Sequence, residues 1–443
     1  MFIKKIFSSP PKFLTTGVIL LIFIGTVLLS LPISRLESSD SIISDAFFTS
    51  TSATCVTGLV VKNTATHWSV FGKIIILTLI QIGGIGFMTI ASFYFLFIGR
   101  KITLRERLLL REQFNVNQKG GIIRLTSSVL KYTFFIELMG ACLLSIYFIP
   151  TYGFKTGLFF SVFHAISSFC NAGFDLFGTS LINFNSNIYV LTIINTLIIL
   201  GGLGFTVIND IFFLRSKKRL STHSKLVIRT SLVLIIFGFI SFMLLEFNNN
   251  ATLGKLNWFE KINASLFQSI SPRTAGFQSI NFQFINDGTI LITIILMFIG
   301  ASPGGTGGGI KTTTLGVLLA TLTSVVRGSD DIEMFGRRLP GFIIFKAITI
   351  FLVSLMLVLS VAFTLILLQP NLRFLDLLFE VTSAFGTVGV SIGIVEKLNL
   401  FGKIALCTLM YLGRVGPLTV LYAINQKKKT SYIRLAEDDV IVG

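Results

Sequence analysis

Long stretches without any charged residue constrain the fold of this chain more than any other feature. Four of them are at least 22 residues long, and a helix of about 20 apolar residues suffices to cross a bilayer. They cover residues 13–34, 74–99, 176–209 and 347–372. Only 13% of the 443 residues are charged, against about 25% in a soluble domain. The mean hydropathy is +0.83, so the sequence predicts an all-α membrane protein.

Four further apolar segments are shorter or interrupted by a polar residue. They cover residues 138–154, 230–245, 289–326 and 404–426. Together with the longer stretches they predict eight membrane crossings. The first stretch could also be a signal peptide, but it is long enough to span and no good small-residue cleavage site follows it. We therefore keep it as a transmembrane helix.

The positive charges indicate which side of the membrane each connection faces. The formal net charge is +17, and 25 of the 37 Lys and Arg residues lie in five clusters. The clusters cover residues 1–12, 99–131, 215–229, 327–346 and 425–443. They occur at every second break between apolar segments, which is the positive-inside pattern and not that of a nucleic-acid-binding surface. Both termini are therefore expected in the cytoplasm.

A short semi-polar stretch recurs four times between consecutive spans, each time with a glycine. The four glycines are spaced by 115, 103 and 113 residues: Gly58, Gly173, Gly276 and Gly389. Six residues before them stand Ser52, Ser167, Ile270 and Ser383. A second glycine follows at offsets of 25, 28, 24 and 24 residues, at Gly83, Gly201, Gly300 and Gly413. This register predicts four repeats, 1–115, 116–222, 223–335 and 336–426, with a cytoplasmic tail at 427–443.

Each repeat is expected to contain a membrane helix, a short re-entrant pore helix with a non-helical strand, and a second membrane helix. Irregular backbone at membrane depth is tolerated only where it lines water or protein, and glycine adopts positive φ without steric cost. Four such strands around an axis would present rings of carbonyl oxygens to a monovalent cation. A tight turn is the alternative for any single glycine, but four in register favour a pore. We predict these filter residues: Thr54, Cys55, Val56, Thr57, Gly58, Asn171, Ala172, Gly173, Thr274, Ala275, Gly276, Thr387, Val388 and Gly389.

A glycine-rich interruption divides the sixth apolar segment, at residues 300–314. Its glycines and its lysine are Gly300, Gly304, Gly305, Gly307, Gly308, Gly309 and Lys311. We interpret it as a movable gating loop beneath the third filter strand; the alternative is a simple kink. Arg414, inside the last span, is predicted to act with this loop as an electrostatic barrier, or else as an anchor on helix-end carbonyls.

Three motifs together resemble a known family. TCVTG at residues 54–58, GASPGGTGGGIKTTT at 300–314 and LGRVGP at 412–417 are similar to the Ktr/Trk/HKT superfamily of potassium transporters, most closely its bacterial KtrB-type membrane subunits. The resemblance covers nearly the whole chain. It implies four membrane–pore–membrane repeats. Glycine at all four filter positions goes with potassium preference, whereas serine at the first position, here Gly58, goes with sodium.

The same resemblance implies partners. KtrB-type subunits form homodimers in the bacterial plasma membrane and dock on a cytosolic ring of RCK-type (KtrA-like) subunits. Any nucleotide is expected on that ring, with no covalently bound cofactor in this chain. Transport of K⁺ is expected to be stimulated by Na⁺.

Several charged residues remain outside these motifs. Arg273 is expected to brace the filter from behind, with Glu380 as a partner by depth alone. Glu137 and Asp210 are minor candidates for a coupling ion. An alternating-access carrier is the competing transport mechanism, although the repeats here share one topology. An intramembrane enzyme is disfavoured because the chain has three isolated histidines and no HExxH or GxSxG motif.

Overall fold

The computed structural model describes residues 10–36, 42–86, 89, 107–110, 122–212, 219–329 and 331–424. Within these residues the chain is helical apart from one antiparallel hairpin, β1 (Glu333–Met334) and β2 (Arg337–Arg338). The predicted tail at 427–443 and the predicted boundary at residues 115 and 116 lie outside the described residues. The predicted boundary at residues 335 and 336 falls in the turn of the hairpin.

Four long apolar helices open the four units. They are α2 (Pro10–Ser30), α8 (Ile122–Tyr152), α13 (Thr222–Glu246) and α17 (Gly341–Leu368). Each contains a segment long and apolar enough to cross a membrane. They correspond to the first, third, fifth and seventh predicted crossings.

A shorter helix follows each of them and ends within six residues of one of the four repeat glycines Gly58, Gly173, Gly276 and Gly389. These pore helices are α3 (Ile42–Cys55), α9 (Phe154–Phe169), α14 (Trp258–Ile270) and α18 (Phe374–Gly386). Asn257 and Glu260 form a capping box at the start of α14, as their spacing predicts. Asp45 and Asp376 lie in the first turns of α3 and α18, where a carboxylate interacts favourably with the positive end of the helix dipole.

The second span of each unit is short or broken. The segments are α5 (Val70–Ile85), α10 (Ile188–Leu203) with α11 (Phe205–Phe212), α15 (Asp287–Phe298) with α16 (Thr312–Val326), and α19 (Leu400–Val415) with α20 (Pro417–Ile424). The helix pairs of the second and fourth units bend by 101° and 90°. Gly86, Gly204 and Gly416 end α5, α10 and α19 with φ of 90–91°, a conformation in which a side chain would be strained.

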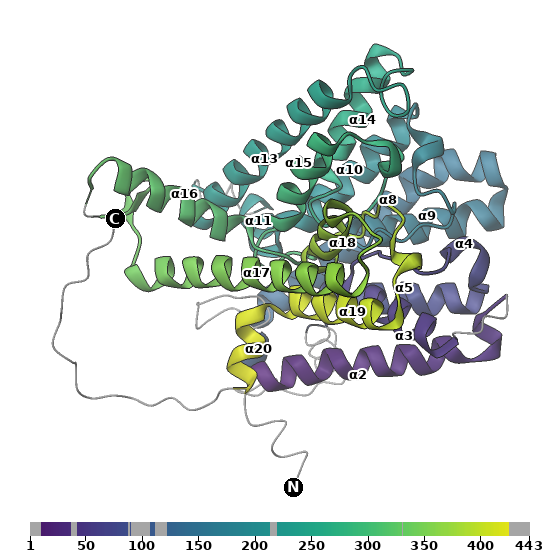
Figure 1. Ribbon diagram of the computed structural model, residues 1–443, viewed down its shortest axis with the longest axis horizontal. Helices are drawn as coiled ribbons and strands as arrows, with labels where there is room; N and C mark the ends of the chain where they lie inside the picture. The colour runs from purple at the N-terminus through teal and green to yellow at the C-terminus, as the bar shows by residue number, and fades with distance from the viewer. Residues whose placement is uncertain are drawn as a thin grey trace, which may run out of the picture.

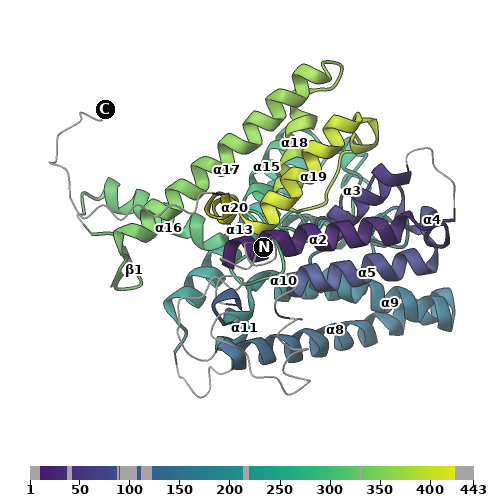
Figure 2. The same cartoon turned by 90° about the horizontal axis from the view of Figure 1, so that it is seen from below.

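Short helices occupy the remaining connections: η1 (Pro32–Ser34), α4 (Thr64–His67), η2 (Ile182–Phe184), η3 (Phe282–Phe284) and η4 (Val395–Lys397). Figures 1 and 2 both show α11, α16 and α20 toward one end of the molecule and α4 toward the opposite end. The distal halves of three second spans thus lie on the same side. This agrees with four units that share one topology.

Neighbouring units share their hydrophobic cores. One cluster joins Leu29 of α2 and Ile76 of α5 to Phe163 of α9 and to Ala172 beyond it. Each first span also packs against its own pore helix, as α8 does on α9. The molecule is therefore an all-α membrane protein of four membrane–pore–membrane units, which confirms the predicted fold class.

Candidate ion pathway

The four strands after the pore helices adopt the same unusual backbone. In each, the glycine and the residue two positions before it have positive φ, while the residue between them does not. The pairs are Val56 (59°) with Gly58 (90°), Asn171 (58°) with Gly173 (67°), Thr274 (79°) with Gly276 (79°), and Thr387 (49°) with Gly389 (93°). Positive φ is uncommon for residues other than glycine, and especially costly for β-branched ones. The sequence pattern placed all eight residues in the predicted filter, but it indicated positive φ only for the glycines.

The four glycines meet in a closed ring. A Cβ atom placed on Gly58 would overlap the carbonyl oxygen of Ala172, and one on Gly173 would lie 2.8 Å from that of Ala275. The same relation joins Gly276 to Val388 and Gly389 back to Thr57. Each strand thus contacts the next in chain order, and the fourth contacts the first. The strands converge on one axis with no room for a side chain at the glycine positions.

Serine hydroxyls tie each strand to its pore helix. Ser52 Oγ accepts from the Gly58 amide at 3.0 Å, and Ser383 Oγ accepts from the Gly389 amide at 3.1 Å. Ser167 donates to the Phe174 carbonyl at 2.8 Å. In the third unit Ile270 replaces this serine, and the next residue, Ser271, donates to the Phe277 carbonyl instead. The structure thus accounts for the one exception in the sequence pattern.

The second glycine of each unit permits close packing on a pore helix. Gly83, Gly201 and Gly413 lie against the carbonyl oxygens of Thr54, Phe169 and Phe385, each four residues before a filter glycine. A side chain on any of the three would overlap that oxygen. In the third unit the corresponding Gly300 lies against Gly308 of the interrupting loop. This packing explains the nearly constant offset between the two glycine signals.

The loop at residues 300–311 is bound to the second unit through backbone hydrogen bonds. Ser302 and Thr306 donate their amides to the carbonyls of Gly202 (3.0 Å) and Gly201 (3.1 Å), and Phe205 donates to Gly304 at 2.9 Å. The loop therefore docks at the break between α10 and α11. Neither the glycine pattern nor the apolar pattern indicated this partner.

The same loop lies directly against the strands. The Gly308 amide donates to the Thr387 hydroxyl at 3.0 Å, and the Thr306 hydroxyl donates to the Phe169 carbonyl at 3.1 Å. A Cβ atom on Gly307 would overlap the Thr274 hydroxyl. The close approach explains why this segment is rich in glycine, and it places the loop directly against the third and fourth strands.

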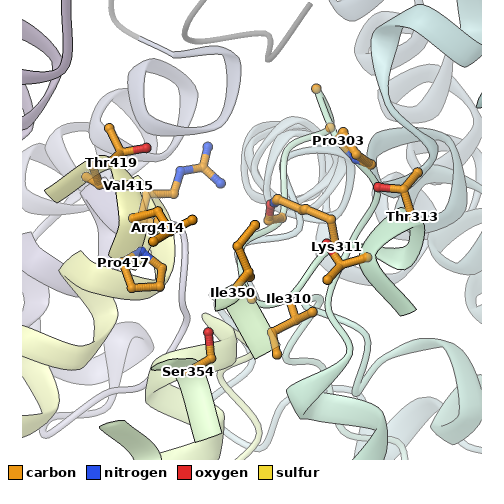
Figure 3. A pocket seen from close by; sticks show the side chains of 18 of the residues that line it. Pro303, Ile310, Lys311, Thr313, Ile350, Ser354, Arg414, Val415, Pro417 and Thr419 are labelled. Carbon is orange, nitrogen blue, oxygen red and sulfur yellow. The ribbon is translucent and has the colours of Figure 1, made fainter. Parts of the chain in front are cut away.

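Arg414 joins the loop to the first unit. Its guanidinium donates to the Thr306 carbonyl on one side and to the carbonyls of Gly83 and Gly84, at the end of α5, on the other. Lys311 donates to the Gly307 carbonyl at 2.7 Å within the loop. Figure 3 shows both side chains at a cavity of about 600 Å³, which they enter from opposite walls. Arg414 is thus bound to helix-end carbonyls and also contacts the loop.

The predicted pairing of Arg273 with Glu380 was wrong. The Arg273 guanidinium points back to its own unit, where it donates to the carbonyl and hydroxyl of Ser231 in α13, both at 3.2 Å. Glu380 accepts from the Ser391 hydroxyl at 2.6 Å and the Ile392 amide at 2.9 Å. Each side chain therefore braces a different unit, because depth in the membrane does not fix the direction in which a side chain points.

The minor coupling-ion candidates have hydrogen-bonding partners. Glu137 accepts from the Gln81 amide at 2.8 Å, and Asp210 accepts from Ser221 (2.6 Å) and Ser224 (2.8 Å) at the start of α13. Among the described residues, no three His, Cys, Asp or Glu side chains are grouped so that they could hold a metal ion. A coupling role for either carboxylate stays a prediction.

Four re-entrant units that converge on one axis define a membrane transport protein. The chain belongs to the TrkH family of cation transport proteins, whose family model matches residues 9–432.

Individual relatives agree with this assignment. The chain is 42% identical to the Ktr system potassium uptake protein B of Bacillus subtilis, over all of this chain and 98% of the relative. It is 40% identical to the potassium/sodium uptake protein NtpJ of Enterococcus hirae, over 98% of this chain and 97% of the relative. The crystal structure of the potassium transporter TrkH from Vibrio parahaemolyticus matches with a TM-score of 0.70 at 18% identity, covering 93% of this chain and 85% of that one. That structure shares the fold.

Proposed function

We propose that this chain is the ion-conducting subunit of a potassium uptake system. The observation that carries the proposal is the closed ring of Gly58, Gly173, Gly276 and Gly389 at the convergence of four non-helical strands. Such strands can replace the hydration shell of a monovalent cation with backbone carbonyl oxygens. Relatives at 40–42% identity that carry potassium uptake in their names support the same substrate.

Potassium selection is assigned to the backbone of the four strands. The carbonyl oxygens of Thr57, Ala172, Ala275 and Val388 each lie beside the glycine of an adjacent strand. The predicted filter residues include no Asp, Glu, Lys, Arg or His, and Arg273 of the third strand turns away to Ser231, so uncharged dipoles would do the selecting. The serine hydroxyls that tie the strands to the pore helices would hold the oxygens at a fixed spacing.

Gating is assigned to the loop at 300–311 together with Arg414. The loop lies beneath two strands and is fastened by Arg414 to the opposite side of the pathway. A guanidinium in this position also opposes the passage of a cation. Movement of the loop away from the strands would require the Arg414 contacts to break, which couples the obstruction to the charge.

The assembly we propose follows the Ktr type. Two copies of the chain form a homodimer in the bacterial cell membrane, and a cytosolic ring of RCK-type subunits binds nucleotide and controls the loop. Na⁺ stimulates uptake, and both termini face the cytoplasm. The alternation of basic connections supports this orientation, and relatives named as components of a Ktr system support the existence of a partner.

Flux through a ring variant tests the proposal. Purified chain in K⁺-loaded vesicles is assayed for ⁸⁶Rb⁺ and ²²Na⁺ uptake, with Gly58→Ser beside the native protein. Gly58→Ser should reduce the Rb⁺ to Na⁺ uptake ratio about ten-fold or more, because φ of 90° and the Ala172 oxygen both disfavour a side chain there.

Gly153→Ser is the matched control. Gly153 has φ of 80° but lies between α8 and α9 with no atom within 4 Å of an added Cβ, so it reproduces the backbone strain without the crowding. An unchanged uptake ratio for Gly58→Ser at normal abundance would contradict a filter at the ring.

A further inference from the structure

The cavity beneath the loop has an unusual charge for a route taken by cations. Three cationic side chains line it, Lys311 of the loop, Lys346 of α17 and Arg414 of α19, together with His223 of α13. None of the described residues that line it is Asp or Glu. The cations come from separate elements, so the charge is a property of the assembled cavity and not of one sequence cluster.

Helix ends add to this positive potential. α16 begins at Thr312 with no side-chain cap, and Thr313 and Thr314 of its first turn line the cavity. Pro417 at the start of α20 lies in the lining as well. The Thr312 and Thr314 amides already donate to the carbonyls of Ala301 (3.3 Å) and Lys311 (2.8 Å), so the contribution of these helix starts is the partial positive charge of the aligned peptide dipoles, which favours an anion nearby.

The cations are only partly compensated by protein groups. Lys311 and Arg414 contact backbone carbonyls, which carry partial charges and not a full negative charge. Lys346 is exposed and makes no hydrogen bond or ion pair with the part of the chain that the structure describes. A full negative charge would therefore be stabilised in the cavity, most directly by Lys346.

The rest of the lining is largely apolar. Phe342, Ile343 and Ile350 of α17 form one wall, and Leu14 and Val18 of α2 belong to another. A cavity of about 600 Å³ with several cations and apolar walls suits a phosphate group, whose oxygens can accept from more than one donor.

We propose that this inner cavity is a binding site for a phosphate-bearing anion, with Lys346 as its principal charged contact. The anion is either free phosphate or the phosphodiester headgroup of an anionic lipid. The inference concerns binding alone and stands whether or not the loop is a gate. Bound anion would offset the positive charge that a cation meets beneath the strands.

Two experiments distinguish free phosphate from a lipid headgroup as the bound anion. Binding of the free anion is measured by isothermal titration calorimetry of the purified full chain with inorganic phosphate. The ionic strength is held constant with chloride. The thermal unfolding midpoint in nanodiscs of phosphatidylglycerol against phosphatidylcholine measures the headgroup. Binding in the first arm identifies free phosphate as a ligand, and stabilisation in the second arm alone identifies the lipid.

A charge-matched pair of variants locates the site. Lys346→Gln should weaken phosphate binding about ten-fold, or abolish the stabilisation by phosphatidylglycerol, as expected when one charge-assisted hydrogen bond is lost. Lys225→Gln removes the same charge from an exposed position of α13 that does not line the cavity, and should leave both readouts unchanged.

Three results would overturn the inference: neither probe has an effect, Lys346→Gln leaves the effect intact, or Lys225→Gln weakens it equally. Rb⁺ uptake by the same preparation is recorded separately. If the native chain takes up no Rb⁺, the potassium proposal is contradicted while the binding result still stands. A failure of the proposed function can therefore be told apart from a failure of the anion-binding inference.

Discussion

The glycine ring and the cavity beneath it differ in symmetry and in charge. In the ring, four strands repeat the same backbone angles and contact one another in chain order, and their one cationic side chain, Arg273, turns away to Ser231. Beneath the ring, a loop from the third unit alone crosses to the second and fourth units, and its contacts include Arg414. The two regions lie directly against each other, as the hydrogen bond from the Gly308 amide to the Thr387 hydroxyl shows.

Under the proposed function, this difference gives four copies of one unit two separate roles. Uniform oxygen dipoles need equivalent contributions from every unit, so each unit retains its glycine and the left-handed residue before it. The proposed obstruction needs to be made only once, and the third unit alone has a long glycine-rich loop where each of the other three has one positive-φ glycine at the end of its helix. Selectivity should therefore depend on all four strands being equivalent, and the rate of uptake should depend on the loop that only the third unit carries.

The largest effect is expected in the ring. Gly276→Ala should reduce Rb⁺ uptake more than ten-fold, because its Cβ would overlap the Val388 oxygen at a φ of 79°, a conformation that costs a residue with a side chain about 1–2 kcal/mol before any clash. Uptake by vesicles is compared with that of Gly153→Ala, which has the same sign of φ in open space. Equal effects of the two variants would mean that strain alone, and not the ring, is responsible.

A smaller change of opposite sign is expected beneath the ring. Arg414→Ala should raise Rb⁺ uptake about ten-fold at unchanged abundance, since it removes a cation from the pathway and the tie between Thr306 and the end of α5. Arg373→Ala is the control, because Arg373 pairs with Asp287 at an exposed site and neither residue lines the cavity. Unchanged uptake for Arg414→Ala would refute its role as a barrier.

The loop itself should respond to the loss of a single hydrogen bond. Thr306→Val keeps the side-chain shape but removes the hydroxyl that donates to Phe169, a bond worth about 1 kcal/mol, and uptake should rise about five-fold. Thr349→Val, whose hydroxyl bonds only within α17, should leave uptake unchanged. If Thr306→Val lowers uptake instead, the closed arrangement does not depend on this contact.

The smallest effect is expected when one serine hydroxyl that holds one strand on its pore helix is removed. Ser52→Ala removes the bond to the Gly58 amide, but the Thr57 amide still donates to the Ser52 carbonyl at 2.8 Å. The Rb⁺ to Na⁺ uptake ratio should therefore fall only about two-fold. Ser30→Ala, which loses a bond within α2, provides the baseline. A collapse of selectivity in Ser52→Ala would show that the four units are not mutually supportive.

Much of the architecture could be predicted because it depends on local signals. Uncharged length indicates the first spans, and α2 and α17 begin and end close to the predicted segments. The glycine register indicates the pore strands and the breaks, since positive φ and close backbone approach both select glycine. The family resemblance agreed with these signals.

What the sequence determined by itself was therefore the membrane setting, the four units and the glycines on which they converge. Only the tertiary structure decided that Arg273 turns to Ser231, that Ser271 stands in for the missing serine, and that the loop docks on the break of the second unit. Hydropathy and backbone conformation depend on residues that are close together in the sequence. Contacts between units depend on how each unit is rotated about the shared axis, which no local pattern specifies.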